Sequence, residues 1–109
     1  MTIGIYTLEL HLPGARSLKD RRQVLRRVKD RLRARHNLSV AELDEHGDLW
    51  QRAGLMMVAV AARRDSLEKL FETVFSEVRT MVPGEVMETG IDFMEGCDGG
   101  PAGWEGDLR

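Results

Sequence analysis

Five basic side chains recur along one predicted helix at a spacing suited to binding phosphate groups. They are separated by three or four residues and are Lys19, Arg22, Arg26, Lys29 and Arg33. On a helix with about 100° per residue these positions fall along one flank, while Asp20 and Asp30 lie near the back. The flank is about 21 Å long, and arginine binds phosphate through paired hydrogen bonds. We call these five residues the cationic ridge and predict that it binds the phosphate backbone of structured RNA.

The charge of the chain is concentrated in the same segment. Residues 16 to 36 contain ten cations and two anions, a charge of +8. The rest of the chain contains 6 cations and 16 anions, a charge of −10, so the formal net charge of −2 conceals a strong asymmetry. A basic stripe of this kind is typical of proteins that bind nucleic acid.

A rival interpretation is that the cationic ridge pairs with carboxylates of the same chain. The available carboxylates are on a second predicted helix (Asp65, Glu68 and Glu72) and in the segment after the first helix (Glu42, Asp44, Glu45 and Asp48). Surface ion pairs contribute roughly 0 to 1 kcal/mol each, so they could occupy the ridge without any function. The spacing of the residues leaves both interpretations open.

Other chemistry has less support in the sequence. The polar and aromatic groups that could form an active site are Glu9, His11, Lys19, Trp50 and Arg52. Glu9 and His11 share a strand face and could act as an acid and a base, but no spacing rule unites the five. Cys97 has no partner at zinc-site spacing, and the glycines form no phosphate loop. We therefore predict no catalytic residue, no metal and no cofactor.

Two predicted segments at the start of the chain position the ridge. Residues 3 to 12 alternate between apolar and polar side chains, which predicts a strand that ends at residues 13–14, Pro-Gly. Ser17 and Asp20 have the spacing of a helix-capping box. The apolar stripe of the helix that follows is Leu18, Leu25, Val28 and Leu32, and the helix should end near His36.

Four further segments complete the domain. Residues 38–43 and 50–62 predict two strands joined by the acidic turn 44–48. Asp65 with Glu68 predicts the cap of the second helix. The apolar face of that helix is Leu67, Leu70, Phe71, Val74 and Val78, and it should end before residues 83–84. A last strand is predicted at residues 85–95.

The order strand, helix, strand, strand, helix, strand is that of the ferredoxin-like βαββαβ sandwich, an α+β fold with two helices on one face of a four-stranded antiparallel sheet. We expect residues 1–95 to form this single domain and the Gly-rich residues 96–109 to be a disordered tail. The second sheet face is apolar at Ile3, Ile5, Met56, Val58 and Met94. An uncovered apolar face predicts a symmetric homodimer or a docking site for another protein.

RNA-recognition domains with this fold stack bases on aromatic side chains of the central strands. The segment RAGLMMVAV of the third predicted strand contains no aromatic residue. We therefore expect RNA to contact the helix, through shape and phosphates more than through base identity.

Three segments of the sequence resemble a known family: LHLPGARSLKDRR, NLSVAEL and DLWQRAGL, in this order. Together they resemble the YlxP-like family of small bacterial proteins, catalogued as domain of unknown function 503, over about residues 1–95. The resemblance implies a ferredoxin-like fold and an association with genes of translation and ribosome maturation. It implies no activity and no catalytic residues.

The sequence as a whole favours a cytoplasmic, non-enzymatic and dimeric accessory protein that contacts ribosomal or other structured RNA through the cationic ridge. The chain lacks a secretory signal pattern and a run of about 20 apolar residues, so we expect no association with a membrane. The alternatives are a protein-interaction module that uses the apolar sheet face or the acidic loop around Trp50, and, third, a small-molecule enzyme.

Overall fold

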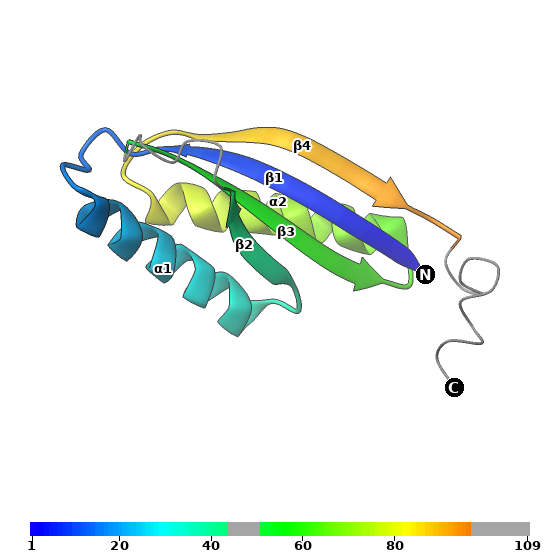
Figure 1. The fold of residues 1–109 in the computed structure, drawn as a ribbon. Coiled ribbons are helices and arrows are strands. Elements are labelled where there is room, and N and C mark those ends of the chain that lie inside the picture. Colours follow the sequence, from blue (N-terminus) through cyan, green and yellow to red (C-terminus); the bar gives the residue numbers. More distant parts are fainter. Residues whose placement is uncertain (44–50, 97–109) are drawn as a thin grey trace.

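The computed structural model describes residues 1–43 and 51–96 and contains four strands and two helices in the predicted order (Figure 1). The elements are β1 (Thr2–His11), α1 (Leu18–Arg35), β2 (Ser39–Leu43), β3 (Arg52–Ala61), α2 (Arg64–Met81) and β4 (Val86–Met94). Each begins and ends within two residues of its predicted bounds. The acidic turn, Trp50 and the tail from residue 97, which includes Trp104, lie outside the described residues.

The four strands form one antiparallel sheet in the order β2-β3-β1-β4. This arrangement confirms the predicted ferredoxin-like βαββαβ fold. The two central strands pair along their whole length, from Thr2 opposite Ala61 to His11 opposite Arg52. The edge strands are β2 and β4, and β4 carries a bulge opposite the step from Thr7 to Leu8.

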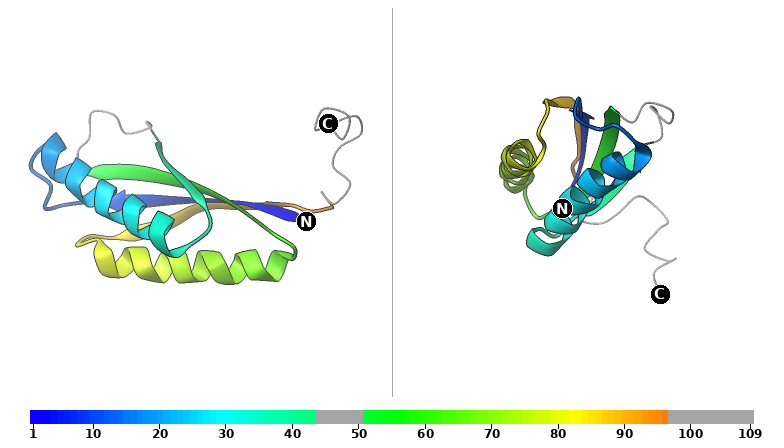
Figure 2. Two further views of the ribbon diagram at one scale, coloured as in Figure 1. Left: turned by 90° about the horizontal axis from the view of Figure 1, so that it is seen from below. Right: turned by 90° about the vertical axis from the view of Figure 1, so that its left-hand side faces the viewer.

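Both helices pack on the same face of the sheet, and one core lies between the two layers. The core combines alternate residues of the central strands with one stripe from each helix. Its largest fully buried side chains include Tyr6, Leu8 and Leu10 of β1, Leu25 and Leu32 of α1, Leu55 and Met57 of β3, and Leu67 and Phe71 of α2. Figure 2 shows α2 running along the sheet and α1 crossing it at the side of β2.

The opposite face of the sheet is covered by neither helix. Ile3 lies between Val60 and Met94 in one row across the sheet, and Ile5 lies between Val58 and Asp92 in the next. Val60 and Met94 are 53% and 54% exposed. The predicted uncovered apolar face is therefore present in the monomer.

The start of α2 differs from its prediction. The helix begins at Arg64, its N-cap residue is Arg63, and no side chain forms a capping hydrogen bond. Asp65 lies inside the first turn and accepts hydrogen bonds from the Arg63 guanidinium at 2.8 and 3.1 Å. The predicted Asp65 cap is wrong because an arginine two residues earlier binds the carboxylate, which still lies at the favourable end of the helix dipole.

Candidate functional site

The first helix begins where the sequence predicts. Ser17 is extended, and its hydroxyl accepts a hydrogen bond from the Asp20 backbone amide at 3.2 Å. The Asp20 carboxylate accepts from the backbone amide of Arg16 at 3.0 Å instead of closing the box on Ser17. The bond to Ser17 satisfies a free amide of the first turn, and the bond from Arg16 ties the residue before the cap to the start of the 18-residue helix that carries the ridge.

One member of the predicted apolar stripe of α1 was wrongly assigned. Leu18 is 42% exposed, and the stripe that packs on the sheet is Arg21, Leu25, Val28 and Leu32. In Figure 1 the first turn of α1 lies beyond the ends of the strands, so Leu18 has no sheet beneath it. Arg21 takes the first position that faces the sheet, one turn before Leu25.

The buried Arg21 links α1 to two strands. Its guanidinium is 2.5 Å from the Glu42 carboxylate of β2 and donates through Nε to the Arg52 carbonyl of β3 at 3.1 Å. Only 7% of Arg21 is exposed. A buried cation needs such partners because desolvation is costly. Arg21 lies four residues before Leu25, and this spacing places it on the buried stripe although its charge alone indicates an exposed residue.

The cationic ridge lies on the flank of α1 that faces the edge strand β2. Arg22, Arg26, Lys29 and Arg33 line one groove between α1 and β2 together with Leu25, Asp30 and Glu42. The predicted position of Asp30 at the back of the helix is therefore wrong, because it lies beside Arg33 on the ridge side. Lys19 continues the ridge at the start of the helix. All five are exposed except Lys29, which is half-buried. The structure thus brings four of the five predicted residues to a single groove.

Within the described residues, most of the charged side chains of the ridge have no carboxylate partner. Arg33 donates to the Val40 carbonyl of β2 at 3.0 Å and lies 4.0 Å from the Asp30 carboxylate. Glu42, the other acid of the groove, pairs with Arg21 from the buried side. Across residues 1–43 and 51–96, no carboxylate forms an ion pair with Lys19, Arg22, Arg26 or Lys29.

The acidic residues of α2 have other partners. Asp65 pairs with Arg63 at 2.8 Å, and Glu68 pairs with Arg64 at 3.1 Å. Glu77 joins the two helices, but through Arg35 at 3.6 Å and His36 at 3.1 Å, which lie at the end of α1. Glu72 lines a different cavity, beside β4. The rival interpretation, in which the ridge pairs with the acidic residues of α2, does not hold for the described residues, because the ridge faces β2 and not α2. Asp44, Glu45 and Asp48 lie outside the described residues.

The residues considered for an active site do not gather in one place. His11 is opposite Arg52 in the sheet, and the Arg52 guanidinium is 3.9 Å from the Glu9 carboxylate, so these three meet at one end of the uncovered face. Lys19 belongs to α1, on the other side of the sheet, and Trp50 is outside the described part of the chain. The described strands β1 and β3 present no aromatic side chain on the uncovered face.

Within the described ranges, no group of three or more His, Cys, Asp or Glu side chains is placed to hold a metal ion. Neither α1 nor α2 is both long and apolar enough to span a membrane.

The chain belongs to the DUF503 family of proteins of unknown function, whose family model matches residues 3–91. A curated relative is the uncharacterized protein YlxP of Bacillus subtilis (strain 168). It is 34% identical over 74 residues, which cover 68% of this chain and 79% of that protein. The resemblance inferred from the three sequence segments is thereby confirmed.

Solved structures share the fold. A de novo designed protein with a ferredoxin fold superposes with a TM-score of 0.54 at 9% identity and covers 88% of each chain. A C-terminal segment of the alpha subunit of aIF2 from Pyrococcus abyssi superposes with a TM-score of 0.52 at 18% identity, over 81% of this chain. This chain spans about half of that segment, 48%. At such identities the likeness establishes the fold alone.

Proposed function

We propose that the protein is an accessory factor that binds the phosphate backbone of structured RNA, on the ribosome or elsewhere, through Lys19, Arg22, Arg26, Lys29 and Arg33. The observation that carries this proposal is the groove between α1 and β2, where four of these cations converge and three have no internal ion pair among the described residues. Phosphate oxygens are ligands that match unpaired guanidinium and ammonium groups.

The neighbouring edge strand favours a helical nucleic acid over an extended peptide. A peptide bound at this groove could extend the sheet by pairing with the edge strand β2. Arg33 already donates to the Val40 carbonyl of that strand, and the strand is only five residues long. A rounded polyanion that rests on the ridge needs no backbone pairing with β2.

Cosedimentation with ribosomes and with purified structured RNA, at several salt concentrations, tests the proposal. The informative variant is Arg22→Glu/Arg26→Glu/Lys29→Glu, because these side chains make no ion pair in the described structure and the reversal leaves the Arg33 contact intact. We expect it to lose binding by 100-fold or more, since each phosphate contact contributes strongly at low salt.

The matched control reverses three cations outside the groove. Arg27 and Arg31 lie on the flank of α1 that faces Thr80 and Met81 of α2, and Lys69 is exposed on α2. The variant Arg27→Glu/Arg31→Glu/Lys69→Glu changes the net charge by the same amount. Equal losses in the two variants would mean that only total charge matters, and binding insensitive to both would refute the proposal.

A second proposed property is a homodimer formed through the uncovered sheet face. The observation that favours it is the row of Ile3, Val60 and Met94, whose outer members are more than half exposed. The same face also carries both Glu9 and Arg52, so a two-fold axis could place opposite charges together. Light scattering should give the mass of a dimer for the wild type and of a monomer for Val60→Glu/Met94→Glu. A monomeric wild type at high concentration would exclude this dimer.

A further inference from the structure

We propose that the cavity between α2 and β4 binds a small organic cation, namely a primary ammonium group on an aromatic or aliphatic body. The cavity has a volume of about 540 Å³, within the range of roughly 300 to 1,000 Å³ typical of small-molecule sites. It lies on the helix-covered side of the sheet, at the edge remote from the cationic ridge. This inference is independent of the proposed RNA binding.

The walls of the cavity are aromatic and rigid. Tyr6 and Phe71 are 1% exposed, and their rings stack at 4.7 Å with an interplanar angle of 10°. Phe93 lies 6.1 Å from Phe71, and Phe75 and Ile91 complete the apolar lining. Aromatic faces attract cations, and they attract them more when water is excluded.

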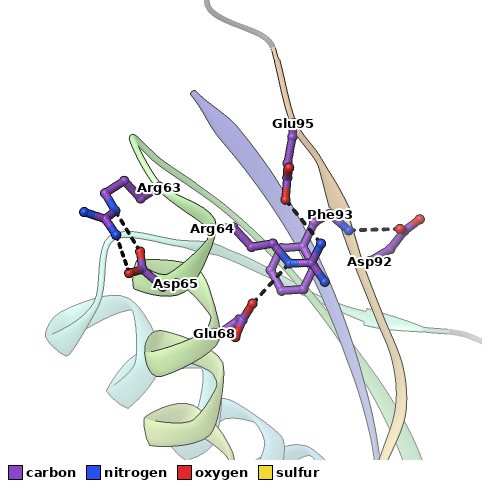
Figure 3. Close-up of polar contacts among 7 residues, drawn as sticks. All are labelled: Arg63, Arg64, Asp65, Glu68, Asp92, Phe93 and Glu95. Carbon is purple, nitrogen blue, oxygen red and sulfur yellow. Dashed lines mark hydrogen bonds and ion pairs between the residues drawn. The ribbon is translucent and has the colours of Figure 1, made fainter.

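One end of the cavity already holds a cation of the chain itself. Figure 3 shows the Arg64 guanidinium over the Phe93 ring, 4.4 Å from its centroid, between the carboxylates of Glu68 and Glu95. The two ion pairs measure 3.1 and 3.2 Å. An aromatic ring flanked by carboxylates therefore holds a cation at this cavity.

The remaining carboxylates of the cavity lining belong to no ion pair of the described residues. Glu72 and Glu88 line the cavity, and neither forms an ion pair with any lysine or arginine in the part of the chain that the structure describes. Glu88 accepts a hydrogen bond from the Tyr6 hydroxyl at 2.6 Å. The buried phenol thus fixes the Glu88 carboxylate at the cavity wall, as a preorganised cation site requires. Phe75 also lines the cavity, and the Arg79 guanidinium lies 5.7 Å from the centroid of its ring.

The proton on Tyr6 is firmly held. Burial raises the pKa of the Tyr6 hydroxyl well above its usual range, and the hydrogen bond to Glu88 and the charges of Glu88 and Glu72 raise it further. Tyr6 therefore remains the donor of this hydrogen bond at physiological pH. The lining carries three carboxylates and one guanidinium, so it attracts a cation and repels an anion.

The free amine 2-phenylethylamine is a suitable probe, with 2-phenylethanol and phenylacetate as neutral and anionic analogues. Each is titrated into the full chain while backbone amide chemical shifts are recorded. The amine should bind saturably with a Kd on the order of 1 mM and shift the amides of Phe75, Glu88 and Ile91. The alcohol should bind about tenfold more weakly, because it lacks the charged hydrogen bond, and phenylacetate should not bind.

Two variants test whether the amine binds at Glu72 and Glu88. Glu72→Gln/Glu88→Gln should weaken binding of the amine about tenfold, because it removes both free charges but keeps a hydrogen-bond acceptor for Tyr6. Asp92→Asn is the matched control, because Asp92 also lies on β4 but on the uncovered face, opposite Ile5. It should leave the Kd unchanged.

Three results would overturn the proposal. The first is equal affinity for the amine and the alcohol, and the second is an unchanged Kd in Glu72→Gln/Glu88→Gln. The third is binding of a lysine-containing peptide without binding of the free amine, which would identify a protein-docking surface instead. Loss of RNA binding in the ridge variants would have no bearing on any of these outcomes.

Discussion

The two edge strands of the sheet are attached to their helices by different kinds of interaction. β2 is joined to α1 by polar contacts, the Arg21 ion pair with Glu42 and the Arg33 hydrogen bond to Val40. β4 is joined to α2 by rings, with Phe71 between Tyr6 and Phe93. The comparison shows how one fold presents a basic groove at one edge and an aromatic, acidic cavity at the other.

The β4 edge should be the less tolerant of added volume. A Cβ atom at Gly84 would lie 1.7 Å from the His11 carbonyl oxygen and 2.7 Å from Cδ of Pro13. Because the backbone of β1 would have to move, we expect Gly84→Ala to lower the free energy of unfolding by about 3 kcal/mol or more, measured by urea denaturation.

Gly14→Ala is the control for this substitution, since a Cβ at Gly14 would have no neighbour within 4 Å. Gly14→Ala should raise the free energy of unfolding by about 0.5 kcal/mol. Similar stabilities of the two variants would show that the β1–β4 junction is not closely packed.

The β2 edge should depend on its buried ion pair. Arg21→Met leaves the Glu42 carboxylate without its cation, so the free energy of unfolding should fall by about 2 to 3 kcal/mol. Arg22→Met is the control, because Arg22 is exposed. It should change the free energy of unfolding by less than about 0.5 kcal/mol. The double variant Arg21→Met/Glu42→Met should be more stable than Arg21→Met alone. Equal losses at positions 21 and 22 would contradict the structural role of Arg21.

The polar contact of the β4 edge should have a smaller effect that depends on pH. Tyr6→Phe removes the hydrogen bond to Glu88 and should lower the free energy of unfolding by about 1 kcal/mol at neutral pH. The pKa of Tyr6 is higher in the folded than in the unfolded chain. In the wild type, Tyr6 should therefore contribute fully to the free energy of unfolding below about pH 10. This contribution should be lost as the pH rises further.

Tyr6 is the only tyrosine of the chain, so its ionisation can be followed directly by ultraviolet absorbance. Tyrosinate should form at the alkaline unfolding transition and not before it. Ionisation near pH 10 in the folded protein, or an equal alkaline loss of stability in Tyr6→Phe, would contradict the buried position of this hydroxyl.

The smallest effect should come from the exposed ion pairs near Phe93. The side chains of Arg64, Glu68 and Glu95 are all about half exposed, so water screens their attraction. Arg64→Gln should change the free energy of unfolding by about 0.5 kcal/mol, and added salt should reduce the difference from wild type. A loss as large as that of Arg21→Met would mean that the two edges are held in the same way.

The fold could be predicted because each element has its own periodicity and end signals. Alternation in β1, the Ser17 cap and the apolar stripe of α2 are local patterns, and local patterns define the order of the elements. The predictions for Leu18 and Asp65 were wrong because the surroundings of these residues determine their roles. The burial of Leu18 depends on where the sheet lies beneath α1, and the capping role of Asp65 depends on a competing arginine beside it.

The two candidate sites also differ in whether local sequence patterns or the tertiary fold bring their residues together. The cationic ridge lies on one helix, so its spacing could be read directly from the sequence. The cavity beside β4 depends on the strand order, which brings Tyr6 and Glu88 together across 82 positions of the chain. No spacing rule connects residues so distant, and for the same reason the Arg21–Glu42 pair was not predicted.

The central claim, that the cationic ridge binds RNA phosphates, is tested most directly by the salt dependence of affinity for a structured RNA. For the wild type, the logarithm of the association constant should fall with the logarithm of salt concentration with a slope of roughly −3 to −4, as expected for about four or five phosphate contacts. The variant Arg22→Glu/Arg26→Glu/Lys29→Glu should reduce the slope by about 3. An equal slope in both proteins, or no measurable binding by the wild type at low salt, would contradict the claim.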